Sequence, residues 1–330
     1  MIAHRAWHWP AAVAVLLLAA ALGIAFGTVR LSLAEVMAGA VGTGDPLHVT
    51  IVQALRGPRV LLAALVGAGL AMSGASLQGV LRNGLAEPYL LGVSGGAAVG
   101  AVLAYAAGYS GYGLLAVAAF AGSLTAVGAT VLAARAAGHG ARGDPRTLLM
   151  AGVVVGAFAN AAIMIALANA PGNTVRSALW WMMGSASDAT WATGAALALM
   201  LSVAGGALVA GARDIDALAL GDEAAAALGV DVDRAAPRIY LLASLVAAAT
   251  VAAVGLVGFV GLIVPHLVRA AGIRRHRALL LAAAIVGATL VIAADTVARV
   301  ALPPAELPLG AVTAILGVPF FLAQLRRFRA

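Results

Sequence analysis

The sequence has 330 residues, of which 63% are apolar and only 10% are charged, and its mean hydropathy is +1.03. A soluble chain would be about half apolar and about a quarter charged, so this composition excludes a soluble enzyme and a disordered protein. One transmembrane helix needs roughly 20 apolar residues. The apolar content therefore predicts an all-α, polytopic membrane protein with about ten transmembrane helices and one domain over residues 1–330.

The net charge of +7 comes from 20 basic residues, all of them Arg, against 13 acidic ones. A Walker A loop needs Lys to reach the β- and γ-phosphates, so the chain has no such ATPase site of its own. The absence of Cys excludes disulfides and thiolate chemistry. We also find no His pair with metal-ligand spacing and no paired carboxylates, so we expect neither a metal site nor a catalytic residue.

Ten apolar runs are predicted to cross the membrane. In chain order they cover residues 10–26, 60–81, 89–107, 114–134, 147–168, 191–212, 237–254, 259–271, 278–297 and 309–325. The first run resembles a signal peptide but lacks a convincing cleavage site, so we expect it to remain as a span. Ten spans put both termini on one side, and 15 of the 20 Arg residues fall on that side. The positive-inside rule then predicts cytoplasmic termini.

Small residues recur every four positions in two of these runs. They are Gly67, Ala71, Ala75 and Gly79 in one run, and Gly96, Gly100 and Ala104 in the next. Such stripes let helix backbones approach closely within lipid. A third set, Gly255, Gly258 and Gly261, indicates a broken segment or a closely packed turn, and the spacing does not decide whether that segment lines a path.

Few polar side chains lie inside the predicted spans. Asp295 lies near the outer end of the ninth span, four residues before Arg299, and this order favours a helical ion pair. Gln78 and Asn160 could line a polar path, although bonding between helices is the default interpretation. The segment 175–184, which contains two Trp residues, predicts a short helix at the outer interface or part of a gate.

For two further regions the sequence favours a functional role and a purely structural role equally. Arg56, Arg59 and Arg299 are predicted on the outer side, where exposed guanidiniums suit either carboxylates on a partner or lipid phosphates. The cytoplasmic loop 213–236 predicts two short helices, with Asp214 and Asp222 as N-caps and Gly221 and Gly229 as terminators. Helices this short need support, so the loop is either a docking knob or a connecting turn.

Several ordered motifs resemble the permease subunits of binding-protein-dependent ABC importers for iron–siderophores, haem and cobalamin, the FecCD/BtuC type. They lie at residues 55–59, 67–79, 82–88, 91–96, 181–185, 220–229, 258–266, 294–299 and 306–310. The likeness covers nearly the whole chain from Leu55 onward. It departs from the family pattern at Gly84, where Pro is usual, and at Gly57, where an aliphatic residue is usual.

The resemblance implies a type II importer permease bundle in the bacterial inner membrane. It implies a second permease subunit, as a homodimer rather than a paralogous pair, two cytoplasmic ATPase subunits, and a periplasmic substrate-binding protein. ATP and magnesium would be bound by the ATPase subunits, so no cofactor is expected in this chain, and no nucleic acid partner is expected.

The resemblance also implies roles for individual residues. Binding-protein docking would fall on Arg56, Arg59 and Arg299. Coupling to the ATPase would fall on Asp214, Gly221, Asp222, Glu223, Ala224, Ala225, Leu228 and Gly229. A gate or path role is expected for Gln78, Asn83, Asn160, Asp144, Pro145 and Arg146.

The leading hypothesis is a permease that moves a bulky metal chelate, with iron–siderophore first and cobalamin or haem next, driven by ATP hydrolysis on separate subunits. An ion-coupled secondary transporter is the alternative from a different class. It predicts ionisable groups at the membrane midplane and an inverted repeat, whereas only the off-centre Asp295 appears. A membrane scaffold or a membrane-embedded enzyme is the third hypothesis.

Overall fold

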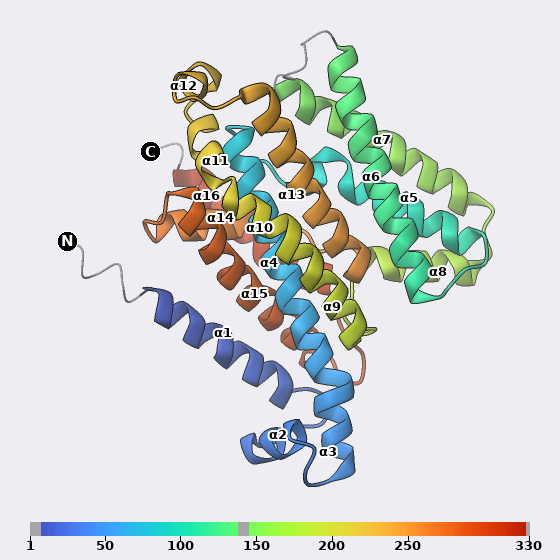
Figure 1. Ribbon diagram of the computed structural model, residues 1–330. Coiled ribbons are helices and arrows are strands. Elements are labelled where there is room, and N and C mark those ends of the chain that lie inside the picture. Colours follow the sequence, from blue (N-terminus) through green and yellow to red (C-terminus); the bar gives the residue numbers. More distant parts are fainter. Residues whose placement is uncertain (1–7, 138–144, 328–330) are drawn as a thin grey trace.

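The computed structural model describes residues 8–137 and 145–327, and every regular element in these ranges is helical (Figure 1). The helices are α1 (His8–Ala25), α2 (Leu33–Ala40), α3 (Pro46–Thr50), α4 (Gly57–Val80), α5 (Val93–Ala106), α6 (Tyr112–Ala136), α7 (Pro145–Ala168), α8 (Gly172–Met183), α9 (Trp191–Met200), α10 (Gly206–Ala210), α11 (Ala212–Leu218), α12 (Asp222–Ala227), α13 (Val232–Val254), α14 (Val260–Ala270), α15 (His276–Val300) and α16 (Leu309–Arg327). Two π-helical turns, Ile51–Arg56 and Leu201–Gly205, join α3 to α4 and α9 to α10. A 3₁₀ turn, Pro88–Leu91, precedes α5.

The ten predicted spans are confirmed as apolar helices. Six helical segments of the described ranges are long and apolar enough to cross a membrane, and four shorter apolar helices accompany them. Each predicted run coincides with one of these ten. The second differs most, because its continuous helical segment begins at Pro46 rather than near Val60.

The stretch between the first two spans contains α2 and α3, which the sequence analysis did not predict. A capping box begins α2, since the Ser32 hydroxyl accepts from the Glu35 N–H at 3.3 Å and the Glu35 carboxylate accepts from the Ser32 N–H at 2.7 Å. Asp45 caps α3, with Pro46 at its first position. Both signals are legible in the sequence. The short helix expected around 175–184 is confirmed as α8.

The centre of the bundle is α4, which packs against α15, α13, α14 and α9 (Figure 1). Its glycines make this packing close. A Cβ atom on Gly67 would lie 2.0 Å from the carbonyl oxygen of Gly287 in α15, and one on Gly74 would lie 2.0 Å from that of Gly261 in α14. The predicted small-residue contacts are therefore confirmed in α4. The same holds between α5 and α6, where a Cβ on Gly100 would lie 2.1 Å from the carbonyl oxygen of Ala118.

The glycine-rich segment between α13 and α14 is a true break, as one of the two interpretations expected. Gly255 has φ +74°, and a Cβ there would lie 2.2 Å from the carbonyl oxygen of Trp181. The Tyr89 hydroxyl donates to the Val257 carbonyl at 3.0 Å and accepts from the Val257 N–H at 2.8 Å. Side-chain hydrogen bonds thus hold a segment that has left helical geometry.

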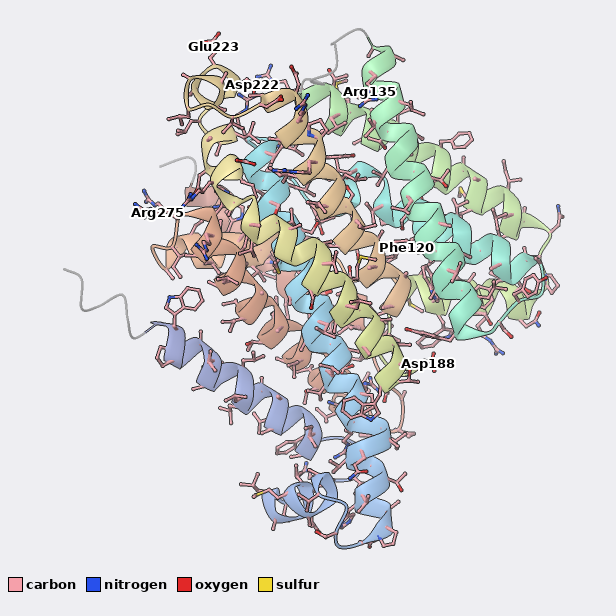
Figure 2. The ribbon with its side chains drawn as sticks, viewed as in Figure 1. Phe120, Arg135, Asp188, Asp222, Glu223 and Arg275 are labelled. Carbon is pink, nitrogen blue, oxygen red and sulfur yellow. The ribbon has the colours of Figure 1, made fainter. Side chains whose placement is uncertain are left out.

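Side chains distinguish the two ends of the bundle (Figure 2). Asp222 and Glu223 lie at the end that carries α11 and α12, and Arg135 and Arg275 lie toward the same end. We call this the α12 end. The opposite end carries α2 and α3, and we call it the α2 end.

Replacement of Gly67 by Ala should destabilise the bundle, because the new methyl group meets the backbone of Gly287 and two packed helices must separate. Overpacking of this kind costs about 1–3 kcal/mol. We expect a lower midpoint of thermal unfolding in detergent. The matched control is Gly128→Ala in α6, where a Cβ has no neighbouring heavy atom within 4 Å. Equal midpoints of thermal unfolding for the two variants would show that α4 and α15 can accommodate a methyl group at Gly67 without loss of stability.

Candidate functional site

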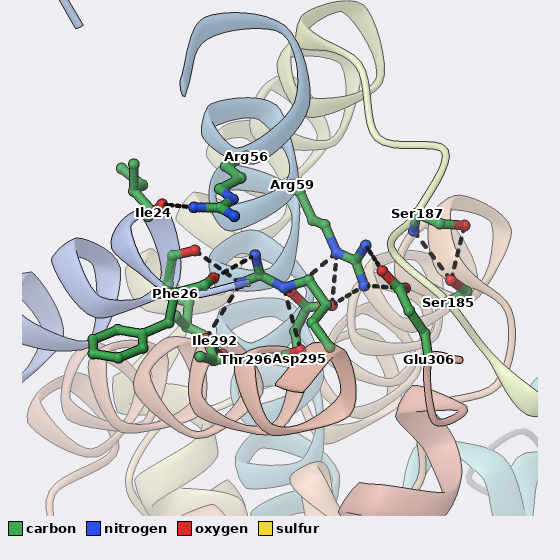
Figure 3. A network of polar contacts seen from close by, with 12 residues as sticks. Ile24, Phe26, Arg56, Arg59, Ser185, Ser187, Ile292, Asp295, Thr296 and Glu306 are labelled. Atoms are coloured by element: carbon green, nitrogen blue, oxygen red, sulfur yellow. Dashed lines mark hydrogen bonds and ion pairs between the residues drawn. The ribbon is translucent and has the colours of Figure 1, made fainter. Parts of the chain in front are cut away.

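A cluster of charged side chains lies at the α2 end, where α4, α15 and the segment before α16 meet (Figure 3). The Arg59 guanidinium donates to the carboxylate of Asp295 from Nε at 3.0 Å and from a terminal nitrogen at 2.9 Å. Its two terminal nitrogens also reach the carboxylate of Glu306 at 3.1 and 2.8 Å. Both contacts have the paired geometry that suits a planar guanidinium.

Arg299 shares Asp295 with Arg59. Its Nε lies 3.1 Å from an Asp295 carboxylate oxygen, so the ion pair predicted from the spacing of four is confirmed. The terminal nitrogens of Arg299 donate to the carbonyl oxygens of Gly23 at 2.8 Å and Phe26 at 3.2 Å. These bonds tie the end of α1 to α15, because helix C-terminal carbonyls lack partners of their own.

Arg56 binds the same stretch of chain without a carboxylate. It donates to the carbonyl oxygens of Ile24 at 2.8 Å and Ala25 at 3.0 Å, and also to that of Val29. Figure 3 shows its guanidinium turned toward Ile24 while Arg59 turns toward Glu306. The two guanidiniums, which start three positions apart on the chain, therefore turn in different directions.

The expected exposure of these guanidiniums is wrong. Arg56, Arg59 and Arg299 are only 6%, 9% and 5% exposed. Each guanidinium is satisfied within the chain, because the end of α1 and the acids of α15 and residue 306 supply acceptors. The sequence analysis gave no role to Glu306, whose side chain is 40% exposed and which brings an acid to the surface of the cluster. Docking of a binding protein here stays a prediction.

The loop 213–236 forms two short helices, as predicted, and three acids of the loop pair with the bundle. Asp214 lies 2.7 Å from Arg238 of α13, and Asp222 lies 3.4 Å from Arg82, which follows α4. The carboxylate of Asp216 accepts from the backbone N–H of His276 at 3.0 Å and lies 2.7 Å from its ring Nδ1. These contacts fix α11 and α12 to α13, α4 and α15.

The predicted caps of these helices are wrong, because the acids pair with distant side chains instead. Gly211 and Gly221 occupy the N-cap positions, and neither Asp214 nor Asp222 caps through its side chain. Gly221 and Gly229 do end the two helical segments, with φ of +111° and +83°.

Burial divides the expected coupling residues into two groups. Ala225 is fully buried and faces the bundle, which makes it unsuited to direct contact with a partner. Ala224 is half-buried, whereas Glu223, Leu228 and Gly229 are exposed. Leu220, also exposed, joins them beside α12. The surface available to a partner therefore consists of one acid among small and apolar residues.

Two of the expected path residues serve local structure. Gln78 is 4% exposed, and its amide donates to the carbonyl oxygens of Gly261 at 3.2 Å and Leu262 at 3.4 Å. Its own carbonyl accepts from Arg269 at 2.5 Å. These bonds link α4 to α14, as the default interpretation expected. The Asn83 side chain accepts from the Leu85 N–H at 2.9 Å and shapes the turn after α4.

Asn160 is the expected path residue that faces open space. It is exposed and lines a hollow of about 380 Å³ between α5, α7 and the 3₁₀ turn, with Tyr89, Ser94 and Met182. Pro145 begins α7 and Arg146, which follows it, is exposed, while Asp144 lies outside the described residues. No group of three or more metal-ligating side chains occurs in the described part of the chain.

The comparisons with known proteins agree with this arrangement. The FecCD transport family matches residues 15–327, so the fold and its features define a polytopic transport permease. The chain is 43% identical over 276 residues to the cobalamin import system permease protein BtuC of Halobacterium salinarum, covering 84% of this chain and 73% of that protein. It is 41% identical to the hemin transport system permease protein HmuU of Yersinia pestis, with 83% of each covered.

A solved structure has the same fold. It is described as an inward-facing metal-chelate type ABC transporter, and it superposes with a TM-score of 0.84 at 29% identity, covering 96% of this chain and 98% of that one. The chain belongs to the FecCD transport family.

Replacement of Arg59 by Gln should destabilise the α2 end, because Glu306 loses its partner and Asp295 keeps only Arg299. Breaking a buried ion pair costs about 3–5 kcal/mol. We expect a lower midpoint of thermal unfolding in detergent. Arg30→Gln, at an exposed position of the same end, should change stability by no more than about 0.5 kcal/mol. If the two variants unfold alike, the cluster contributes nothing to stability.

Proposed function

We propose that this chain is the membrane-spanning subunit of an importer for a bulky metal chelate, with iron–siderophore as the first candidate and haem or cobalamin next. Transport is driven by ATP hydrolysis on two separate cytoplasmic subunits. A periplasmic protein delivers the ligand at the α2 end, and the α12 end faces the cytoplasm. The relatives named for cobalamin and haem support this class of cargo.

The tethered pair α11–α12 is the observation that carries the proposal. These helices are too short to be stable alone, yet three acids fix them to α13, to α15 and to the turn after α4. A rigid helix pair of this kind can transmit a movement of the ATPase to α4, α13 and α15 at the same time. A secondary transporter, which has no separate ATPase subunit, does not need such a helix pair.

The α2-end cluster suits a docking surface of modest positive charge. Three arginines against Asp295 and Glu306 leave a net charge of +1, that is 3 − 2. Acids on a binding protein would compete with Glu306 for Arg59, whereas Asp295 and Arg299 lie deeper. Charges at the rim of an interface act mainly on encounter.

A second copy of the chain would complete the path. The exposed surface of α7 is largely apolar, with Phe158 77%, Met164 74% and Ile165 76% exposed. Asn160 and its hollow lie on the same helix. Two such faces brought together would bury the apolar side chains and enclose a passage with few charges, which suits a large cargo that the binding protein has already selected.

Glu306→Gln should strengthen association with the cognate binding protein, because the net charge of the cluster rises from +1 to +2 and Arg59 gains free donors. We expect a several-fold faster association rate in surface plasmon resonance, with the difference reduced at high salt. Asp188→Asn, an exposed acid elsewhere at the same end, is the control for a general charge effect. Slower association of Glu306→Gln than of the control would contradict docking at Arg59.

The whole proposal is tested in proteoliposomes that contain the permease with its ATPase and binding protein. We expect uptake of radiolabelled ferric siderophore, haem or cobalamin to require ATP. Leu228→Arg should abolish uptake and co-purification of the ATPase, since it places a long charge on the exposed face of the α11–α12 knob. Ala136→Arg, exposed in α6, is the matched control. Uptake that follows a proton gradient without ATP would refute the proposal.

A further inference from the structure

A groove opens at the α12 end, between the start of α1 and the turn that joins α14 to α15. Its mouth is a hollow of about 670 Å³ lined by Trp9, Ile273, Arg274 and Arg275, among others. A second hollow of about 180 Å³ shares Trp9 and Ile273 with it. The shared residues make the two hollows one groove, with its mouth at the end of the bundle and a slot that runs inward.

The slot is apolar throughout. Besides the shared residues it is lined by side chains of α1, α14 and α15, namely Ala12, Leu267, Val268, Ala282 and Val286. Trp9 is half-buried at the junction between mouth and slot. A Trp ring is typical of the depth at which a bilayer changes from head groups to acyl chains.

The mouth is basic and is not neutralised by the chain. Arg274, Arg275 and Arg277 are exposed, and none of them has an ion pair or side-chain hydrogen bond within the described residues. The sequence from residue 271 to residue 294 contains no acid. The Asp216 carboxylate, which contacts the start of α15, is engaged by His276. By contrast Arg82, Arg234 and Arg238 at the same end each pair with an Asp.

We propose that this groove binds one anionic glycerophospholipid, with its phosphate at Arg274 and Arg275 and an acyl chain in the slot beside Trp9. Basic residues next to apolar helices at the membrane surface attract anionic lipid head groups. The other face of α1 already faces the acyl region, since Leu17 and Leu18 are 64% and 58% exposed. A lipid reaches the slot from that side by lateral diffusion.

Other occupants lack this complementarity. The N-terminal residues before α1 include Arg5 and no acid, so their charge does not complement that of the mouth. A second copy would present its own basic α12 end to the groove. The site does not depend on the direction of transport or on the cargo, so it stands apart from the proposed function.

The bound lipid has a structural consequence. The helix α1 contacts the bundle chiefly through α15 and makes only slight contact with α4. A lipid between α1 and the α14–α15 turn would close the open side of that contact. Removal of anionic lipid should therefore loosen α1 first, while the packing around α4 persists.

The test uses delipidated full-length protein in a neutral detergent, titrated with phosphatidylglycerol and followed by native mass spectrometry and by thermal unfolding. We expect one tightly held lipid and a higher unfolding midpoint, and no such effect from phosphatidylcholine with the same acyl chains. Arg274→Gln with Arg275→Gln should weaken the binding at least about tenfold, the effect of losing about 1.4 kcal/mol. Arg135→Gln with Arg213→Gln removes the same charge from exposed positions of the same end.

A second variant tests the slot without changing charge. Ala12→Phe fills it and should also weaken the binding. Equal binding by the two double-arginine variants, or by Ala12→Phe and the unaltered protein, would overturn the proposal. So would a phosphatidylcholine affinity equal to that of phosphatidylglycerol. Stabilisation by inorganic phosphate or glycerol phosphate as large as that by the lipid would assign the arginines to a free anion and also overturn it.

Discussion

The close approach of backbones around α4 is the constraint on which the rest of the structure depends. In lipid, apolar surface gives helices no reason to associate, so packing must come from van der Waals contact and hydrogen bonds. Gly67 meets Gly287 and Gly74 meets Gly261 with no room for a methyl group. The hydrogen bonds of Gln78 to α14 become possible only because the helices are this near. A central helix so tightly held can act as a rigid axis for its neighbours.

That axis connects the two ends of the molecule. Arg59, near the start of α4, holds the acids of the α2-end cluster, and Arg82, just after its end, pairs with Asp222 of α12. A displacement of α12 would thus act on Arg82, two residues beyond α4, and a change among the acids of the α2 end would act on Arg59 in its first turn. In the proposed importer these are the places where ATPase and binding protein would act. The chain supplies the link between them through one helix rather than through a relay of contacts.

The sequence was sufficient for the spans and for their close contacts, because long apolar runs and glycine spacing are local signals. It was insufficient for the partners of charged groups. Asp214 and Asp222 read as helix caps, yet they pair with Arg238 of α13 and with Arg82 in the turn after α4. Likewise Arg56 and Arg59 read as exposed because nothing nearby in the sequence could satisfy them. Their acceptors come from α1, α15 and Glu306, and only the tertiary fold brings these together. The sequence analysis did not predict α2 and α3, although the capping-box residues Ser32 and Glu35 indicate the start of α2.

The π-helical turn Ile51–Arg56 determines the direction in which α2 and α3 lie relative to α4. In an α-helix each residue turns the chain by about 100°, and a π turn accommodates an extra residue that would otherwise rotate everything before it. Arg56, the last residue of that turn, faces the end of α1, while Arg59, one α-helical turn later, faces Asp295. The number of residues in this turn therefore determines the rotation of α2 and α3 about the axis of α4. In related chains a single insertion or deletion in this turn would change the direction of the helices equivalent to α2 and α3. The other helices of the bundle would stay in place.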